Sequence, residues 1–149
     1  MKLPFVQRLV HLLLVTVGFA AAGSAAAAAT PNLALGPSHG LAVTEAGVVV
    51  AWGSDQYGQL GLGRALGYAS PRVIVPGVKF KAVAGGVTHA LAVDVSGNVW
   101  AWGDNTQGQL GIRTLSGQPV TSQTVPAMVA GINNAVQVTA GRSNLFSAA

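Results

Sequence analysis

The chain has 149 residues, of which 50% are hydrophobic and only 8% are charged, and its formal net charge is +4. This length is enough for one domain of ordinary size. The absence of cysteine excludes disulfide bonds and thiolate metal sites. The basic residues form no run and no stripe with interleaved aromatic residues, so the footprint of a nucleic-acid-binding surface is missing.

Residues 1–29 are typical of a secretory signal peptide. Lys2 and Arg8 provide a short basic start, residues 9–22 are mostly apolar, and an alanine-rich tract ends at the expected cleavage site. The alternative is an uncleaved membrane anchor, because residues 9–29 are long enough to span a bilayer. Alanine is weakly hydrophobic and no basic stop-transfer cluster follows, so we favour a cleaved, helical signal segment. The expected location is therefore secreted, periplasmic or at the cell surface.

The rest of the chain repeats itself with an offset of fifty residues. Near-copies of residues 38–43 and 51–61 occur, without a gap, fifty positions later. A fixed period near fifty is typical of architectures in which each repeat is one supersecondary unit stacked on its neighbours. We assign residues 30–149 to such repeats, which span residues 36–85, 86–140 and, incompletely, 141–149.

Each repeat opens with a predicted β-hairpin. In the first repeat, the period-two alternation covers residues 39–44 and 48–52, with a turn at Ala46-Gly47 between them. The second repeat has the same pattern around Ser96-Gly97. Both faces of the hairpins are apolar, which predicts sheets covered on both sides, as in the blades of a β-propeller.

A glycine-rich turn, a loop and two short strands complete each repeat. The turns carry Gly58-Gln59-Leu60-Gly61 and Gly108-Gln109-Leu110-Gly111. Loops that differ between the repeats follow, and proline then opens the next predicted strand. The predicted loops span residues 62–70 and 112–125, and the predicted strands span residues 71–75, 80–84, 126–130 and 135–140.

These motifs in this order resemble the repeat of the regulator of chromosome condensation family. The shared pattern is Ala-Gly-x-x-His, then Trp-Gly-x-Asn/Asp-x-x-Gly-Gln-Leu-Gly, then a proline-led strand, and it extends from about Leu33 to the end of the chain. The kelch repeat has a similar period and a glycine doublet, but it lacks the Gly-Gln-Leu-Gly turn. The resemblance implies a seven-bladed propeller fold suited to binding proteins.

The predicted fold class is therefore all-β. We expect a partial β-propeller of about two four-stranded blades plus the first strand of a third, preceded by the helical signal segment. Two blades cannot close a ring, and they leave apolar faces and backbone edges open. We expect the sequence to be a fragment of a longer protein, or else identical chains to self-associate through their open blades.

His39 and His89 stand at the same place in the two repeats. A zinc site needs three or four protein ligands, and the chain offers no cysteine and no third converging histidine. We therefore predict no metal site and no cofactor. Both histidines are interpreted as buried side chains that form hydrogen bonds within their blades.

Asp55 and Asp104 are the carboxylates that an enzyme acting on glycosidic bonds would need. They do not occupy matching positions, because Asp55 corresponds to Asn105 and Asp104 corresponds to Ser54. Asp and Asn are common turn formers, so we interpret both as structural. We predict no catalytic residues and no enzymatic activity.

Trp52, Trp100 and Trp102 are candidates for stacking against sugars. Trp52 and Trp102 recur at the repeat position, which favours packing between blades. Trp100 replaces Val50 and is the tryptophan free to take another role.

The predicted function is non-catalytic binding of another protein by an exported propeller repeat module. Loops 62–70 and 112–125 differ most between repeats and are the expected contact surface. Some secreted bacterial members of the family inhibit β-lactamases, so the resemblance makes an enzyme inhibitor an alternative. A carbohydrate-binding or polysaccharide-acting surface protein is the other alternative. No nucleic-acid partner is expected, and no membrane partner after signal cleavage.

Overall fold

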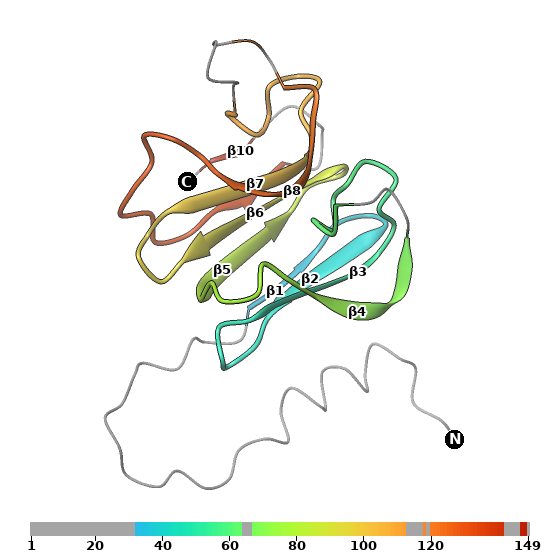
Figure 1. The fold of residues 1–149 in the computed structure, drawn as a ribbon, viewed down its shortest axis with the longest axis horizontal. Coiled ribbons are helices and arrows are strands. Elements are labelled where there is room, and N and C mark those ends of the chain that lie inside the picture. The colour runs from blue at the N-terminus through green and yellow to red at the C-terminus, as the bar shows by residue number, and fades with distance from the viewer. Residues whose placement is uncertain (1–31, 64–66, 113–117, 119, 142–146, 149) are drawn as a thin grey trace, which may run out of the picture.

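The computed structural model describes residues 32–63, 67–112, 118, 120–141 and 147–148, and every regular element among them is a β-strand (Figure 1). The all-β prediction is confirmed. Among these residues, no helix is long and apolar enough to cross a membrane. The predicted signal segment, residues 1–29, lies outside the described residues.

Eight of the strands form two antiparallel four-stranded sheets, each with its strands in chain order. The first blade contains β1 (Asn32–Leu35), β2 (His39–Val43), β3 (Val49–Gly53) and β4 (Tyr68–Ile74). The second blade contains β5 (Phe80–Gly85), β6 (His89–Asp94), β7 (Val99–Asp104) and β8 (Ser122–Met128). A third sheet pairs β9 (Thr139–Ala140) with β10 (Ser147–Ala148). The predicted hairpin turns are present, with Gly47 and Gly97 at φ of 75° and 86°.

The blades are offset by one strand from the sequence repeats. Strand β5 lies at the end of the first repeat, yet it pairs with β6 and belongs to the second blade. It also lies against β1 and β2 of the first blade (Figure 1). The chain therefore crosses from the outer strand of one blade to the first strand of the next, which links neighbouring blades covalently.

The outer strands begin earlier than the sequence predicted, at Tyr68 and Ser122. The register of β3 with β4 shifts between Ala51 and Gly53, and three residues of β4, the last of them Pro71, face one residue of β3. A β-bulge in an edge strand tolerates proline because no ladder hydrogen bond is lost there. The second blade has the same shift beside its own proline. The strands therefore extend through the proline.

These strands correct the predicted loop boundaries. Residues 68–70 of the predicted loop 62–70 are part of β4, and residues 122–125 of the predicted loop 112–125 are part of β8. Much of the remainder, residues 64–66, 113–117 and 119, lies outside the described residues.

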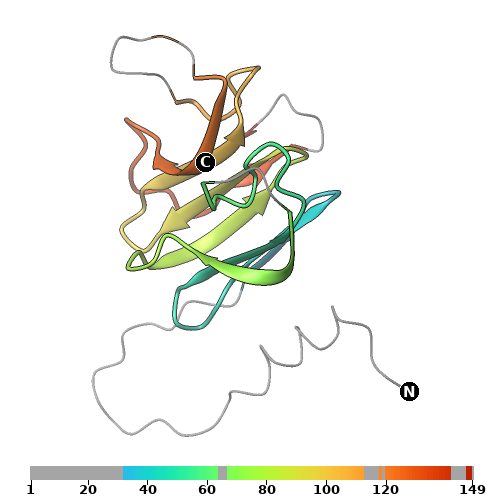
Figure 2. The same cartoon turned by 45° about the vertical axis from the view of Figure 1, so that its right-hand side comes forward.

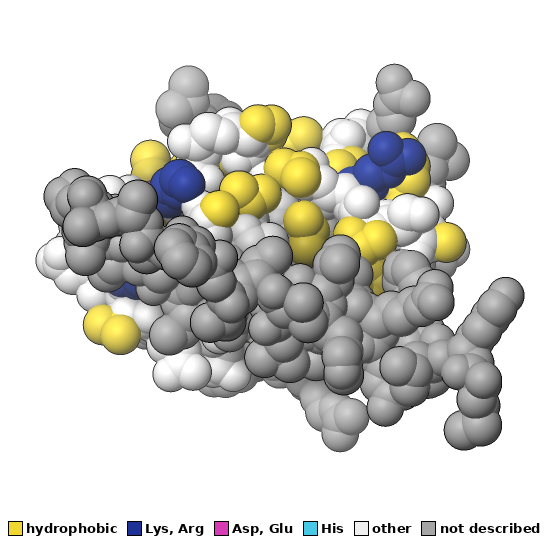
Figure 3. Space-filling view, turned by 90° about the horizontal axis from the view of Figure 1, so that it is seen from below, with side chains coloured by type: hydrophobic (Ala, Val, Ile, Leu, Met, Phe, Trp, Pro, Cys, Tyr) yellow, Lys and Arg dark blue, Asp and Glu magenta, His cyan; other side chains and the backbone are white. Residues whose placement is uncertain are grey.

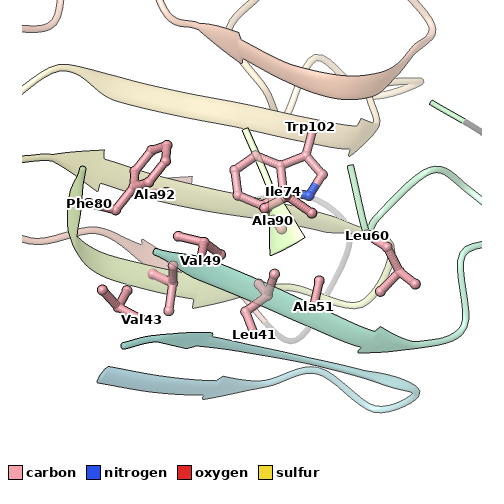
Figure 4. Close-up of a cluster of buried hydrophobic side chains, with 11 residues drawn as sticks. Leu41, Val43, Val49, Ala51, Leu60, Ile74, Phe80, Ala90, Ala92 and Trp102 are labelled. Carbon is pink, nitrogen blue, oxygen red and sulfur yellow. The ribbon is translucent and has the colours of Figure 1, made fainter. Parts of the chain in front are cut away.

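The larger core lies between the two four-stranded sheets, which stack face to face (Figure 2). Because side chains alternate along a strand, the odd-numbered residues of β2 and β3 face the second blade. Figure 4 shows the side chains of the two sheets meeting there. The first blade contributes Leu41, Val43, Val49, Ala51, Leu60 and Ile74, and the second contributes Phe80, Val83, Ala90, Ala92 and Trp102.

A second core covers the other face of the second blade. Leu91, Val93, Val99 and Ala101 pack there against Leu110 and against residues 129–138, which follow β8. Every residue of β6 is buried as a result. The prediction of a sheet covered on both faces is confirmed for this blade.

The other face of the first blade, with the even-numbered residues of β2 and β3, is open. The register places Leu33 and Val73 beside Ala42 and Val50 on this face, with Leu35 beside Gly40. Leu35 is 62% exposed and Val73 is 52% exposed. Figure 3 views the molecule from this side and shows hydrophobic side chains gathered across the part that is visible. In the second blade, Val83 and Ala92, which correspond to Leu33 and Ala42, are buried against the first blade, whereas Met128, which corresponds to Val73, is 57% exposed.

We expect charge on this open face to suppress self-association of the chain. The purified wild-type protein should show a sedimentation coefficient that rises with concentration, because exposed apolar sheet faces associate. The variants Leu35→Lys and Val73→Lys should remove most of that rise. Val95→Lys is the matched control, since Val95 is 59% exposed on a hairpin tip away from this face. A wild-type protein that stays monomeric at all concentrations contradicts the expectation.

Candidate functional site

The two Gly-Gln-Leu-Gly turns are built by the same hydrogen bonds. In the first turn, Asp55 Oδ1 accepts the backbone N–H of Leu60 at 2.8 Å. In the second, Asn105 Oδ1 accepts the backbone N–H of Leu110 at 2.8 Å. An oxygen at this position is the shared requirement, so Asp and Asn are interchangeable. The interpretation of Asp55 as a turn former is confirmed.

The glutamine side chains of the turns also accept hydrogen bonds from the backbone. The side-chain oxygen of Gln59 accepts the N–H of Tyr57 at 2.8 Å, and that of Gln109 accepts the N–H of Gln107 at 3.0 Å. Both glutamines are buried. Each turn is therefore held by buried side chains, while its tip, with Tyr57 or Gln107, faces outward.

Asp104 is held by hydrogen bonds from uncharged donors. Its Oδ1 accepts the N–H of Thr106 at 3.0 Å. Its Oδ2 accepts hydrogen bonds from the Thr88 hydroxyl at 3.3 Å, the Thr106 hydroxyl at 3.2 Å and the Gln109 amide at 3.0 Å. The structural interpretation of Asp104 is confirmed, and its carboxylate lies at the start of the second turn.

The first turn is clamped onto the second blade. The indole N–H of Trp102 donates to the backbone oxygen of Gln59 at 2.8 Å, and the N–H of Gly63 donates to the backbone oxygen of Thr124 in β8 at 2.9 Å. A Cβ on Gly58 would stand 2.8 Å from the Thr124 side chain, so the turn has no space for one. The contact fixes the turn of one blade on the outer strand of the next.

A hollow of about 410 Å³ lies between this turn and the second blade. Its walls are formed by residues 56–58 of the first turn and by Asp104, Thr106, Thr121, Ser122 and Thr124 of the second blade. Sequence reasoning missed this site, because Tyr57 and Asp104 come from different repeats and stand at positions where the repeats differ.

The histidines predicted to be equivalent are both buried, against glycines of the same motif. A Cβ on Gly36 would lie 2.4 Å from the ring of His39, and one on Gly86 would lie 2.3 Å from the ring of His89. The His39 side chain is 4% exposed and that of His89 is fully buried. The Gly-x-x-His spacing therefore places each ring where only glycine leaves room.

The prediction that both histidines form hydrogen bonds within their blades is wrong for His39. Neither of its ring nitrogens has a hydrogen-bond partner among the described residues. Burial, and secondly the nearby His89, lower the pKa of His39 to about 4. A neutral imidazole can pack as a flat, largely apolar group, and here it lies against the glycine backbone. The described residues contain no cluster of three or more potential metal ligands.

The three tryptophans differ in their roles. Trp102 is fully buried between the blades, which confirms the packing interpretation for this residue. Trp52 is half-buried on the open face of the first blade, beside Gly40. Trp100 is packed against the core, meets Phe80 edge-to-face with ring centroids 5.9 Å apart, and donates to Asp94 at 3.0 Å.

Asp94 organises the second hairpin, a role the sequence reasoning missed. It accepts hydrogen bonds from the backbone N–H groups of Ser96 and Asn98, both at 2.9 Å, and from the Trp100 indole. Burial alone raises the pKa of Asp94, but these hydrogen bonds outweigh it and lower the pKa. The spacing Asp-x-Ser-Gly-Asn was the available signal, because an Asp side chain commonly bonds the backbone two residues on.

Two family models for the regulator of chromosome condensation (RCC1) repeat match the chain. One matches residues 46–93 and 96–147, and the other matches residues 32–59 and 80–109. Together they cover both blades. No curated protein matches the chain.

Solved propeller structures resemble the fold. The crystal structure of human WBSCR16 has a TM-score of 0.63 at 29% identity over 72% of this chain. The structure of Kap60 bound to yeast RCC1 (Prp20) has a TM-score of 0.60 at 23% identity over 73%. That of Prp20p from Saccharomyces cerevisiae has a TM-score of 0.62 at 21% identity over 80%. The matches cover 27%, 27% and 30% of those longer chains.

We expect Gly86→Ala to destabilise the protein by about 1–3 kcal/mol, because its Cβ would overlap the His89 ring. The three atoms nearest to that Cβ all belong to His89, so the same substitution should cost much less in a His89→Ala background. Urea unfolding of the four proteins measures the coupling. Gly36→Ala is the contrast, since its Cβ would also stand 2.5 Å from the backbone oxygen of Gly86 and removal of His39 should rescue it only in part. Additive effects at Gly86 would contradict the packing described.

The lowered pKa of His39 predicts that acid destabilises the fold. Between the ordinary value of 6.5 and about 4, the unfolded chain binds a proton that the folded chain does not, so the free energy of unfolding falls as the pH falls. The loss from His39 alone should approach about 3 kcal/mol at pH 4. His39→Asn, which places at this site the residue that the third repeat carries as Asn144, should flatten the dependence. Urea unfolding midpoints at pH 7 and pH 4.5 measure this loss of stability. An equal fall of the midpoint in the wild type and in His39→Asn would contradict the prediction.

Proposed function

Because the chain belongs to the regulator of chromosome condensation (RCC1) repeat family, we propose that it is a non-catalytic repeat module that binds another protein. The observation that carries the proposal is that the two blades share one framework of turns but differ in the loops that follow these turns. Both turns are held by matching buried hydrogen bonds, whereas the loops that follow them differ in length and sequence. A rigid scaffold that presents variable loops suits recognition of a partner.

The solved relatives support a protein partner in general terms. Prp20p was studied for its binding to Gsp1p and histones, and yeast RCC1 is bound by Kap60. Those partners belong to proteins of which this chain matches less than one third, at 21–23% identity. We therefore propose a protein partner without carrying over its identity, and we place its contact on loops 62–70 and 112–125.

We further propose that the module is exported. The basic start and apolar stretch within residues 1–29 support a signal peptide. The apolar open face of the first blade supports a parent protein with further blades.

Inhibition of an enzyme is the narrower form of the protein-binding proposal. The role of Trp100 as a free sugar platform loses support, because its ring packs between the blades and its N–H is used by Asp94.

The test is a loop graft. Residues 112–121 are replaced by residues 62–67, the shorter loop at the corresponding place in the first repeat, and both proteins are used to capture partners from the extracellular fraction. We expect the wild-type protein to retain one defined protein that the graft loses, while the urea midpoint changes little. Val136→Ser, at a residue that is 80% exposed on the segment covering the second blade, is the control and should retain the partner. Equal capture by the graft would place the contact elsewhere, and no specific capture would contradict protein binding.

A further inference from the structure

The hollow between the blades combines an exposed aromatic ring with a carboxylate that forms no ion pair with any lysine or arginine of the described residues. Tyr57 lines one wall and is 48% exposed, and Asp104 lines the other and is 8% exposed. The donors to Asp104 among the described residues are uncharged, namely Thr88, Thr106 and Gln109. Among the described residues no lysine or arginine forms an ion pair with it. Its negative charge therefore remains available at the hollow.

The nearby histidine leaves this charge in place. Burial lowers the pKa of His89, although Asp104 acts in the opposite direction. His89 is therefore neutral near pH 7 and does not balance the carboxylate. The Coulomb attraction of an opposite charge is stronger at a largely buried carboxylate than at one in water.

The remaining walls suit a group with several N–H donors. Thr106, Thr121, Ser122 and Thr124 line the second-blade side of the hollow, and each carries a hydroxyl oxygen that can accept a hydrogen bond. Tyr57 supplies an aromatic face, and cations are attracted to such a face. The chain already contains this arrangement elsewhere, where the Arg72 guanidinium lies over the Tyr68 ring at 5.1 Å from its centroid.

The two repeats show that the backbone of the turn forms without either key residue, although Asp104 also accepts hydrogen bonds within its own blade. The position of Tyr57 is filled by Gln107 in the second turn, and the position of Asp104 is filled by Ser54 in the first. Both turns nevertheless have the same backbone hydrogen bonds. The Tyr57–Asp104 pair is thus an addition to the framework at this one interface of the described blades.

We propose that the hollow between the two blades binds an arginine or lysine side chain of a protein partner, with Asp104 pairing to its charge and Tyr57 stacking on it. The proposal rests on the proposed protein-binding function and specifies the chemistry that the partner presents. A sugar can also stack on Tyr57 and donate hydroxyl hydrogen bonds to the carboxylate, so it is the competing occupant that the test separates from a cation.

The test uses small probes, so it does not depend on finding the partner. N-acetyl-arginine amide is titrated into the ¹⁵N-labelled full chain and compared with N-acetyl-citrulline amide, its uncharged counterpart. We expect shifts at the amides of Tyr57, Thr106 and Thr121 that saturate with arginine, and at least tenfold weaker binding of citrulline. Maltotriose tests the sugar alternative and should cause no shifts at these amides.

The variants are substitutions that the repeat itself carries. Asp104→Ser and Tyr57→Gln each place in one turn the residue of the other, and both should weaken the arginine probe at least tenfold. Asp94→Thr is the matched control, because it removes an equal charge at a hairpin outside the hollow and introduces the residue that the first repeat has as Thr44. It should bind the probe as the wild type does. Tyr57 is an exposed turn residue, so its variant provides a test even if Asp104→Ser fails to fold.

Three results would overturn the inference. Equal binding of arginine and citrulline, or binding of maltotriose in their place, would show that charge is not recognised. No shifts at the hollow with arginine would show that no site exists there. Equal weakening by Asp104→Ser and Asp94→Thr would indicate general attraction to a negative surface. No specific capture by the wild-type protein, with probe binding intact, would contradict the proposed function while leaving this site in place.

Discussion

The structure depends on the need of each sheet to bury two apolar faces. The strands of the second blade have hydrophobic side chains on both sides, and the blade lies between the first blade and the segment 129–138. Small residues permit this stacking, because Ala90 and Ala92 allow the first blade to approach closely. Trp102 then fills the space beside them and closes the contact with a hydrogen bond to Gln59. Burial of a large aromatic ring together with its one polar atom stabilises such an interface well.

The same constraint accounts for the difference between the repeated tryptophans. Trp102 reaches the turn of the preceding blade, whereas Trp52 has no preceding blade among the described residues. Its ring lies close to Gly40 of its own sheet, where a Cβ would stand 2.4 Å from the indole. Gly58 and Gly108 show a similar contrast, since Gly58 is crowded by Thr124 and Gly108 has no atom within 4 Å. One motif therefore has different surroundings depending on whether a neighbouring blade is present.

The period and the strand pattern were enough to predict the all-β class, the hairpins, the turns and the stacking of sheets. They could not assign β5 to a blade, because a repeat with a fixed offset has no defined starting point, and only hydrogen bonding shows that β5 pairs with β6. The bulge at Pro71 could not be predicted either, because a proline in a sequence indicates a strand boundary as readily as a bulge. The failure at His39 arose from a general expectation about buried polar groups, which close glycine packing and a lowered pKa overrode.

The hollow between the blades could not be predicted from one repeat, because it exists only where the turn of one blade meets the next blade. Its framework is fixed by buried groups that both turns share, namely Asp55 or Asn105 and the glutamines, whereas the positions of Tyr57 and Asp104 differ between the repeats. The residues at the positions of Tyr57 and Asp104 can therefore change without changing the clamp. In a longer array, each interface between blades would combine a residue from one turn with a residue from the next blade. Recognition would then be set by such pairs, while stacking of the sheets keeps every interface in the same geometry.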